Sequence, residues 1–189
     1  DGYRAGVFDQ VISFDLYIQG TSREISALTG TTVSMTSTSG LTAGDRVVIF
    51  QNRGNSDQNV GVAQISSVAA GSIVVDRITT ISGSLSIDGS NDHLVLMNGN
   101  ALSMIPPDAS TIATGVITFE VTVDNDDGYL IQVIEDGNMR EGTNAIDDVA
   151  DGTVSTGSEE FGARSSDSSL TNSAFDTQDA AITSTAQDI

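Results

Sequence analysis

Residues 12–18 read Ile-Ser-Phe-Asp-Leu-Tyr-Ile, and residues 117–123 read Ile-Thr-Phe-Glu-Val-Thr-Val. In both stretches apolar and polar side chains alternate strictly, which is the period of a β-strand with one buried face. Shorter stretches of strand-forming residues follow along the chain. We expect further strands at residues 32–36, 46–51, 60–66, 72–77, 84–87, 93–97, 129–135 and 160–164.

Turn-forming residues separate these stretches, for example Thr-Ala-Gly-Asp at residues 42–45 and Asp-Gly-Ser-Asn-Asp at residues 88–92. Many short strands between turns favour an all-β sandwich or barrel. Residues 21–28 can form a short helix, with Thr21 and Glu24 as a capping box, or equally a short strand or a loop. We predict an all-β fold, a jelly-roll-like β-sandwich over residues 21–189, with residues 1–20 as an N-terminal extended strand or arm.

The pattern also predicts a local hairpin between residues 116–123 and residues 129–135. A five-residue loop at 124–128 would bring apolar residues of the two strands together on one face. The pairs would be Val123–Tyr129, Val121–Ile131 and Phe119–Val133. Residues 165–189 are rich in Ser, Thr, Asp and Ala, and they contain no obvious closing strand.

The chain is strongly acidic, with 26 Asp and Glu residues, seven Arg, no Lys and a formal net charge of −19. Such a surface repels nucleic acid and anionic membranes, so we expect neither as a partner. No apolar run approaches the roughly 18 residues that a membrane-spanning helix needs. The sequence begins at Asp1 rather than Met, which leads us to expect a processed, extracellular protein; both a salty habitat and an ordinary acidic cell surface are compatible with the charge.

The residue inventory gives little support for catalysis. Cysteine is absent, which excludes a disulfide framework, a thiolate metal site and a Cys nucleophile. His93 is the only histidine, and no Gly-x-Ser-x-Gly motif accompanies it. The adjacent acid pairs lie in or beside predicted turns, and the chain has no Trp to form a sugar-binding platform. We therefore predict that the protein is not an enzyme.

Calcium is the one cofactor that the sequence leaves open. Asp124, Asp126 and Asp127 offer several carboxylate oxygens in one loop, and oxygen is the ligand that Ca²⁺ prefers. The loop is not an EF-hand, because Gly128 falls at position five instead of six. The predicted hairpin would also carry Glu135 roughly 20 Å away from the loop.

The C-terminal part resembles a recurring segment of secreted and surface proteins of prokaryotes. The resemblance is carried by residues 117–133 (ITFEVTVDNDDGYLIQV), 142–146 (GTNAI), 151–154 (DGTV) and 157–162 (GSEEFG). It implies a β-sandwich on the cell exterior. In size and strand content the whole chain is similar to fibre subunits of the TasA/camelysin type, in which the N-terminal strand of one subunit completes a sheet of the next.

We therefore predict a structural subunit of an extracellular filament or pilus that polymerises head to tail by donor-strand addition, with a second copy of itself as partner. A strand supplied by another chain can complete a sheet that lacks one. The alternatives are an adhesin that binds a surface glycan or protein, with or without Ca²⁺, and a viral capsid or tail-fibre protein. The expected donor strand comprises Val7, Phe8, Val11, Ile12, Phe14, Leu16 and Ile18.

Overall fold

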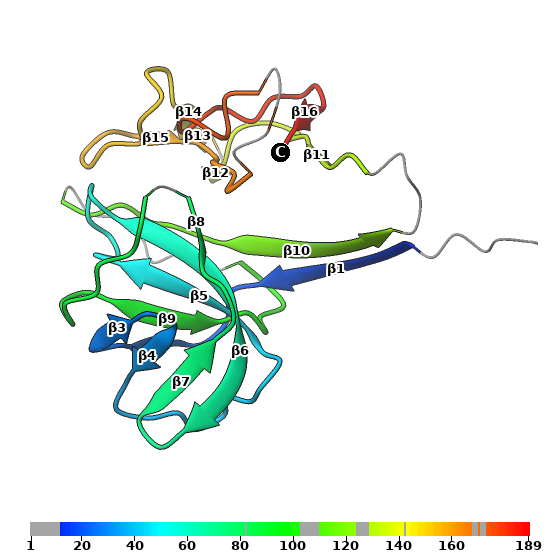
Figure 1. The fold of residues 1–189 in the computed structure, drawn as a ribbon. Coiled ribbons are helices and arrows are strands. Elements are labelled where there is room, and N and C mark those ends of the chain that lie inside the picture. The colour runs from blue at the N-terminus through cyan, green and yellow to red at the C-terminus, as the bar shows by residue number, and fades with distance from the viewer. Residues whose placement is uncertain are drawn as a thin grey trace, which may run out of the picture.

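The computed structural model describes residues 12–81, 83–102, 110–123, 129–141, 143–167, 170 and 173–189. All regular secondary structure in these residues is β-strand (Figure 1), which confirms the predicted all-β class. The jelly-roll strand order stays a prediction. Within the same residues there is no helix of the length and apolarity that a membrane span requires.

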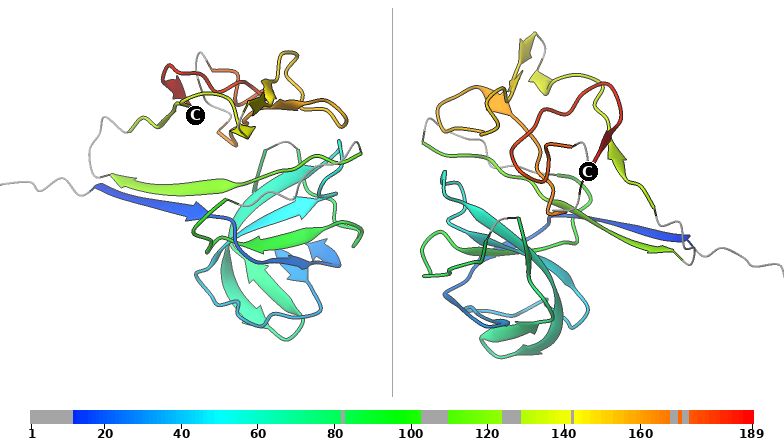
Figure 2. Two further views of the ribbon diagram at one scale, coloured as in Figure 1. Left: turned by 180° about the vertical axis from the view of Figure 1, so that it is seen from behind. Right: turned by 45° about the horizontal axis from the view of Figure 1, so that its top comes forward.

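The main sheet has eight strands in the order β2-β9-β5-β6-β7-β4-β3, with β8 paired to β6. Its edge strands, β2 and β3, are separated in the sequence by two residues, so the sheet curls back toward itself (Figures 1 and 2). The result is a sandwich-like body with a core between the curled faces. The strands are β2 (Ser22–Glu24), β3 (Ala27–Thr29), β4 (Thr32–Ser34), β5 (Arg46–Gln51), β6 (Asn59–Ala69), β7 (Ser72–Val75), β8 (Thr79–Thr80) and β9 (His93–Leu96).

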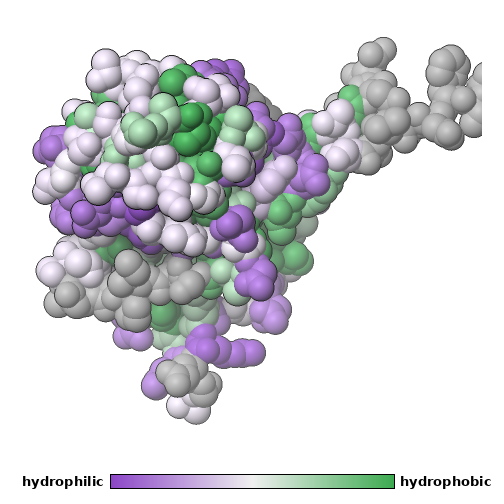
Figure 3. All heavy atoms as spheres, turned by 90° about the horizontal axis from the view of Figure 1, so that it is seen from below, coloured by the Kyte–Doolittle hydropathy of each residue, from purple (hydrophilic) through white to green (hydrophobic). Residues whose placement is uncertain are grey.

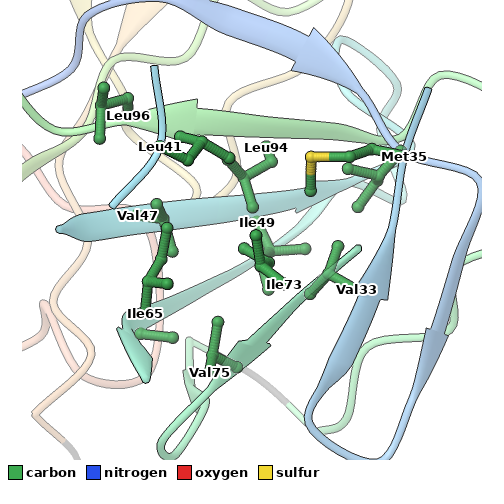
Figure 4. Packing of buried hydrophobic residues seen from close by; sticks show 12 residues of the cluster. Val33, Met35, Leu41, Val47, Ile49, Ile65, Ile73, Val75, Leu94 and Leu96 are labelled. Atoms are coloured by element: carbon green, nitrogen blue, oxygen red, sulfur yellow. The ribbon is translucent and has the colours of Figure 1, made fainter. Parts of the chain in front are cut away.

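The central strands are buried on both faces. Val47 and Ile49 of β5 point into the larger core (Figure 4), while Val48 and Phe50, which alternate with them, point into a second core on the other side. Each fully buried side chain of this kind stabilises the fold by about 1.5–3 kcal/mol. The larger core comprises Ile25, Val33, Met35, Leu41, Val47, Ile49, Ala63, Ile65, Ile73, Val75, Leu94 and Leu96.

A buried carboxylate holds the loops at one end of this body. Asp92 is buried, and its Oδ1 accepts a hydrogen bond from the backbone N–H of Asn52 at 3.0 Å. Its Oδ2 accepts from the backbone N–H groups of Asp88 and Gly89, both at 2.8 Å. Three charge-assisted bonds to backbone donors explain how an acidic side chain is tolerated inside the fold.

The remaining strands form four small two-stranded sheets. The longest pairs β1 (Ile12–Ile18) with β10 (Ile117–Val123). The other three lie in the region beyond residue 129, where Val149 and Phe175 are buried. They pair β11 (Gln132–Val133) with β16 (Gln187–Asp188), β12 (Arg140–Glu141) with β13 (Asn144–Ala145), and β14 (Asp147–Asp148) with β15 (Glu160–Phe161).

Three local expectations are corrected. The predicted hairpin is wrong, because β10 pairs with β1 and the strand after the loop pairs with β16 instead. Strand β1 offers four apolar pairs across β10, whereas the hairpin would have offered three. Residues 84–87 are not a strand, although Leu85 and Ile87 pack against the larger core. Residues 165–189, in which the sequence showed no obvious closing strand, contain β16 near the C-terminus. Of the alternatives left open for residues 21–28, the structure has strands, β2 and β3.

Candidate assembly site

Strands β1 and β10 form a two-stranded antiparallel ribbon, called the ribbon below, that extends away from the body (Figures 1 and 2). All seven residues of each strand are paired without a bulge. The register places Phe14 opposite Val121, Leu16 opposite Phe119 and Ile18 opposite Ile117. Because directly opposed residues share a face, the apolar residues of both strands lie on the same side of the ribbon.

This apolar face is only half covered. Phe14 is 55% exposed, Leu16 is 54% exposed and Ile117 is 50% exposed. Phe119 is 39% exposed, and its ring stacks on that of Phe14 with centroids 6.2 Å apart. Figure 3 shows apolar residues on the ribbon where it leaves the rounded body. A two-stranded ribbon is marginally stable in water without a further packed layer, so this face is suited to contact with another element.

The opposite face of the ribbon is polar and is held to the body. Arg46 of β5 forms an ion pair with Glu120 of β10, and its guanidinium carbon lies 5.9 Å from the centroid of the Tyr17 ring. Burial works to lower the pKa of Arg46, but the hydrogen bond and charge of Glu120, followed by Tyr17, raise it overall. Tyr17 also packs against the second core. These contacts fix the polar face of the ribbon to the body, whereas the apolar face is half exposed.

The base of the ribbon is fixed by a buried amide. The backbone N–H of Gln19 donates to the carbonyl of Val116 at 3.3 Å, and the side-chain Oε1 of Gln19 accepts from the backbone N–H of Val116 at 3.0 Å. The backbone N–H of Gly99 donates to the carbonyl of Ile18 at 2.9 Å. A Cβ on Gly99 would lie 2.1 Å from the carbonyl oxygen of Gln19, so this approach requires glycine. The ribbon therefore leaves the body at a defined position.

The predicted site residues fall into two groups. Val7, Phe8, Val11, Asp124, Asp126 and Asp127 lie outside the described residues. Ile12, Phe14, Leu16 and Ile18 lie in β1 and are paired within the chain. The described residues contain no group of three or more His, Asp or Glu side chains that could hold a metal ion. Calcium binding by the 124–128 loop stays a prediction.

His93 belongs to a small polar cluster that the sequence did not predict. Its Nδ1 lies 3.3 Å from Oγ of Ser22, and Nη1 of Arg53 donates to the same oxygen at 2.9 Å. Burial lowers the pKa of His93, and the positive charge of Arg53 lowers it further. Ser22 lies in β2, Arg53 lies in the loop that follows β5, and His93 lies in β9. No motif spacing links the three residues in the sequence.

Comparison with protein families, with curated proteins and with solved structures found no match to this chain.

Proposed function

We propose that the protein is a structural subunit of an extracellular filament and that subunits join head to tail when β1 of one chain adds to the next. The observation that carries the proposal is the ribbon. Its two strands are joined by no turn, since the whole body lies between them in the sequence, and its apolar face is half exposed. Apart from the bridge between Ile18 and Gly99 at its base and the packing of Tyr17, β1 is held by β10 alone, and such a strand can be exchanged for the same strand of another copy.

Exchange conserves most of the energy of the ribbon. The same register, with Phe14 opposite Val121 and Leu16 opposite Phe119, can form between two chains as well as within one. The exchange itself therefore changes the free energy little. Additional covering of the apolar face by the receiving subunit supplies the driving force, because burial of apolar area is favourable.

The contact is also open-ended. A subunit that donates β1 leaves its own β10 unpaired, and that strand can receive β1 from a third chain. Such a contact uses two different surfaces of each subunit, so it does not close on itself unless the rotation between subunits happens to form a ring. A linear filament is the expected product.

The absence of cysteine allows a direct test. Ser13 and Thr122 are register partners on the polar face of the ribbon. Opposed residues in antiparallel strands have Cα atoms within the range of a disulfide. In the double variant Ser13→Cys/Thr122→Cys, oxidation before assembly ties β1 to its own β10. Oxidation after assembly instead records which chain β1 has joined.

The proposal expects filaments from the reduced variant by negative-stain electron microscopy and none from the variant oxidised beforehand. Oxidation of the filaments should give a ladder of covalent oligomers on a non-reducing gel. A monomer band alone would show that β1 stays within its own chain. That result would refute strand donation, while the filament itself would stand. Single particles in every condition, for the unmodified chain as well, would refute the filament. The single variants Ser13→Cys and Thr122→Cys, which lack a paired thiol, are the controls.

A further inference from the structure

Arg53 is a half-buried cation without a carboxylate partner. The one ion pair among the described residues joins Arg46 to Glu120, so Arg53 has no carboxylate partner there. Burial lowers the pKa of Arg53, so its charge is held in a poorly solvated position. Acidic residues outnumber basic ones by 26 to seven in this chain, which makes an unpaired, half-buried arginine unexpected.

The guanidinium is held in place on both sides. Its central carbon lies 5.0 Å from the centroid of the Phe50 ring, and Phe50 is fully buried in the second core. On the other side, Nη1 donates to Oγ of Ser22. The backbone N–H of Arg53 donates to the carbonyl of Asn91 at 2.8 Å, which fixes the loop itself. One side of the group is thus a cation–π contact, and the remaining N–H donors have no described acceptor.

The neighbouring acids do not neutralise this charge. Both oxygens of Asp92 already accept backbone hydrogen bonds, as described above. Glu24 is exposed and lies opposite His93 in the β2–β9 register, but it is not within ion-pair distance of Arg53. Glu24 and Asp92 act on the cluster only through their charges, which work to raise the pKa of His93 against the larger effects of burial and Arg53. The groups in contact with one another are the guanidinium of Arg53, the hydroxyl of Ser22 and the imidazole of His93.

We propose that Arg53, Ser22 and His93 form a binding site for a carboxylate group of a ligand. The planar fork of arginine matches a carboxylate in a bidentate geometry, and the hydroxyl can add a further hydrogen bond. Serine has one O–H, so the two tautomers of His93 differ: with the ring proton on Nδ1 the Ser22 hydroxyl is free to donate to the ligand, and with the hydroxyl donating to Nδ1 the ring proton is on Nε2, which takes its place as the second donor. A phosphate dianion fits less well, because a single cation faces the negative field of the whole chain. The site does not depend on the proposed filament.

The single histidine makes the site directly observable. The ring signals of His93 in an NMR spectrum come from one residue, so they can be followed while acetate or glucuronate is added at constant pH and ionic strength. We expect a saturable shift with either carboxylate and none with chloride. Arg53→Gln should raise the dissociation constant at least about tenfold, and Arg53→Lys, which keeps the charge but loses the fork, should also weaken binding. Arg77→Gln, at an exposed arginine elsewhere in the body, is the matched control and should bind normally.

The carboxylate could come from another copy of the chain or from a small ligand. A second series of NMR spectra, recorded at increasing protein concentration without added ligand, distinguishes these two sources. A His93 shift that grows with protein concentration and disappears in Arg53→Gln would assign the carboxylate to an acidic side chain of another copy. Saturation by acetate or glucuronate in a chain that shows no such concentration dependence would assign it to a small ligand or an acidic sugar. Shifts that are linear and equal for acetate and chloride, together with no concentration dependence, would overturn the proposal. Ser22→Ala, at an exposed position, repeats the test if Arg53→Gln does not fold.

Discussion

The double variant Phe14→Thr/Leu16→Thr tests whether the apolar face of the ribbon is covered during assembly. Threonine keeps a high strand propensity, so the change removes apolar area without disfavouring the strand. Full burial of a Phe or Leu side chain is worth about 1.5–3 kcal/mol, and in the single chain both are slightly less than half buried. The single chain therefore gains about 1 kcal/mol from each, and about the same amount again is available only when a neighbour covers them.

The variant should consequently affect the body and the assembly very differently. Neither residue belongs to the two cores, so we expect the urea midpoint of the body, followed by circular dichroism, to change little. Loss of about 2 kcal/mol from each contact between subunits should raise the critical concentration for assembly by about 30-fold. Sedimentation of assembled material over a series of protein concentrations measures this value.

The matched control is Val68→Thr/Val74→Thr, which removes two apolar side chains that are 37% and 36% exposed on strands of the body. We expect its critical concentration to remain within a factor of about three of that of the unmodified chain, since surface substitutions rarely exceed 0.5 kcal/mol. An unchanged critical concentration in the ribbon variant would refute the reasoning. A collapse of the body in that variant would show that the ribbon is part of the folding unit.

Three further predictions concern stability. Asp92→Ala removes three charge-assisted hydrogen bonds and should lower the free energy of unfolding in urea by about 3–5 kcal/mol. The control Asp57→Ala, at an exposed acid, should change it by less than about 1 kcal/mol. A loss below about 1 kcal/mol for Asp92→Ala would contradict the anchoring role of this carboxylate. Thr118→Val replaces a hydroxyl that is buried without a hydrogen-bond partner, so the variant should stabilise the ribbon. Hydrogen exchange of the ribbon amides should then slow by a factor of about five, and faster exchange would contradict this prediction. The backbone N–H of Gln64 donates to Asp76 and lowers the pKa of that carboxyl below 3.8, so its stabilisation is present above about pH 4 and is lost as the pH falls further. Urea midpoints at pH 5 and pH 3 should therefore fall more steeply for the unmodified chain than for Asp76→Asn, and parallel falls would contradict this.

The strands could be predicted from the sequence because side-chain alternation depends on local burial. Residues 12–18 and 117–123 have an uninterrupted period of two, and both are strands in the structure. Residues 84–87 show the limit of the same signal. Leu85 and Ile87 face the core as expected, yet the segment pairs with no strand. Alternation reports which side chains are buried, and it does not report where the backbone hydrogen bonds go.

Pairing partners and composite sites could not be predicted for a related reason. The local hairpin was predicted because a five-residue loop would bring the apolar residues of two neighbouring segments together on one face. The complementary patterns of β1 and β10 contained the correct pairing, but a pattern of eight apolar residues is matched by other segments too. The cluster of Ser22, Arg53 and His93 is assembled only by the curled sheet, so no spacing rule along the chain identifies it.

The two proposed contacts depend on charge in opposite ways, and this difference separates them. The apolar face of the ribbon contains no charged residue, while Glu120 on the other face is paired with Arg46. Joining two chains of net charge −19 through this face is opposed mainly by general repulsion, which salt screens over about 8 Å at physiological ionic strength. Assembly through the ribbon should therefore strengthen as salt is added. Binding of a carboxylate at Arg53 is a local attraction between opposite charges, and the same addition of salt should weaken it.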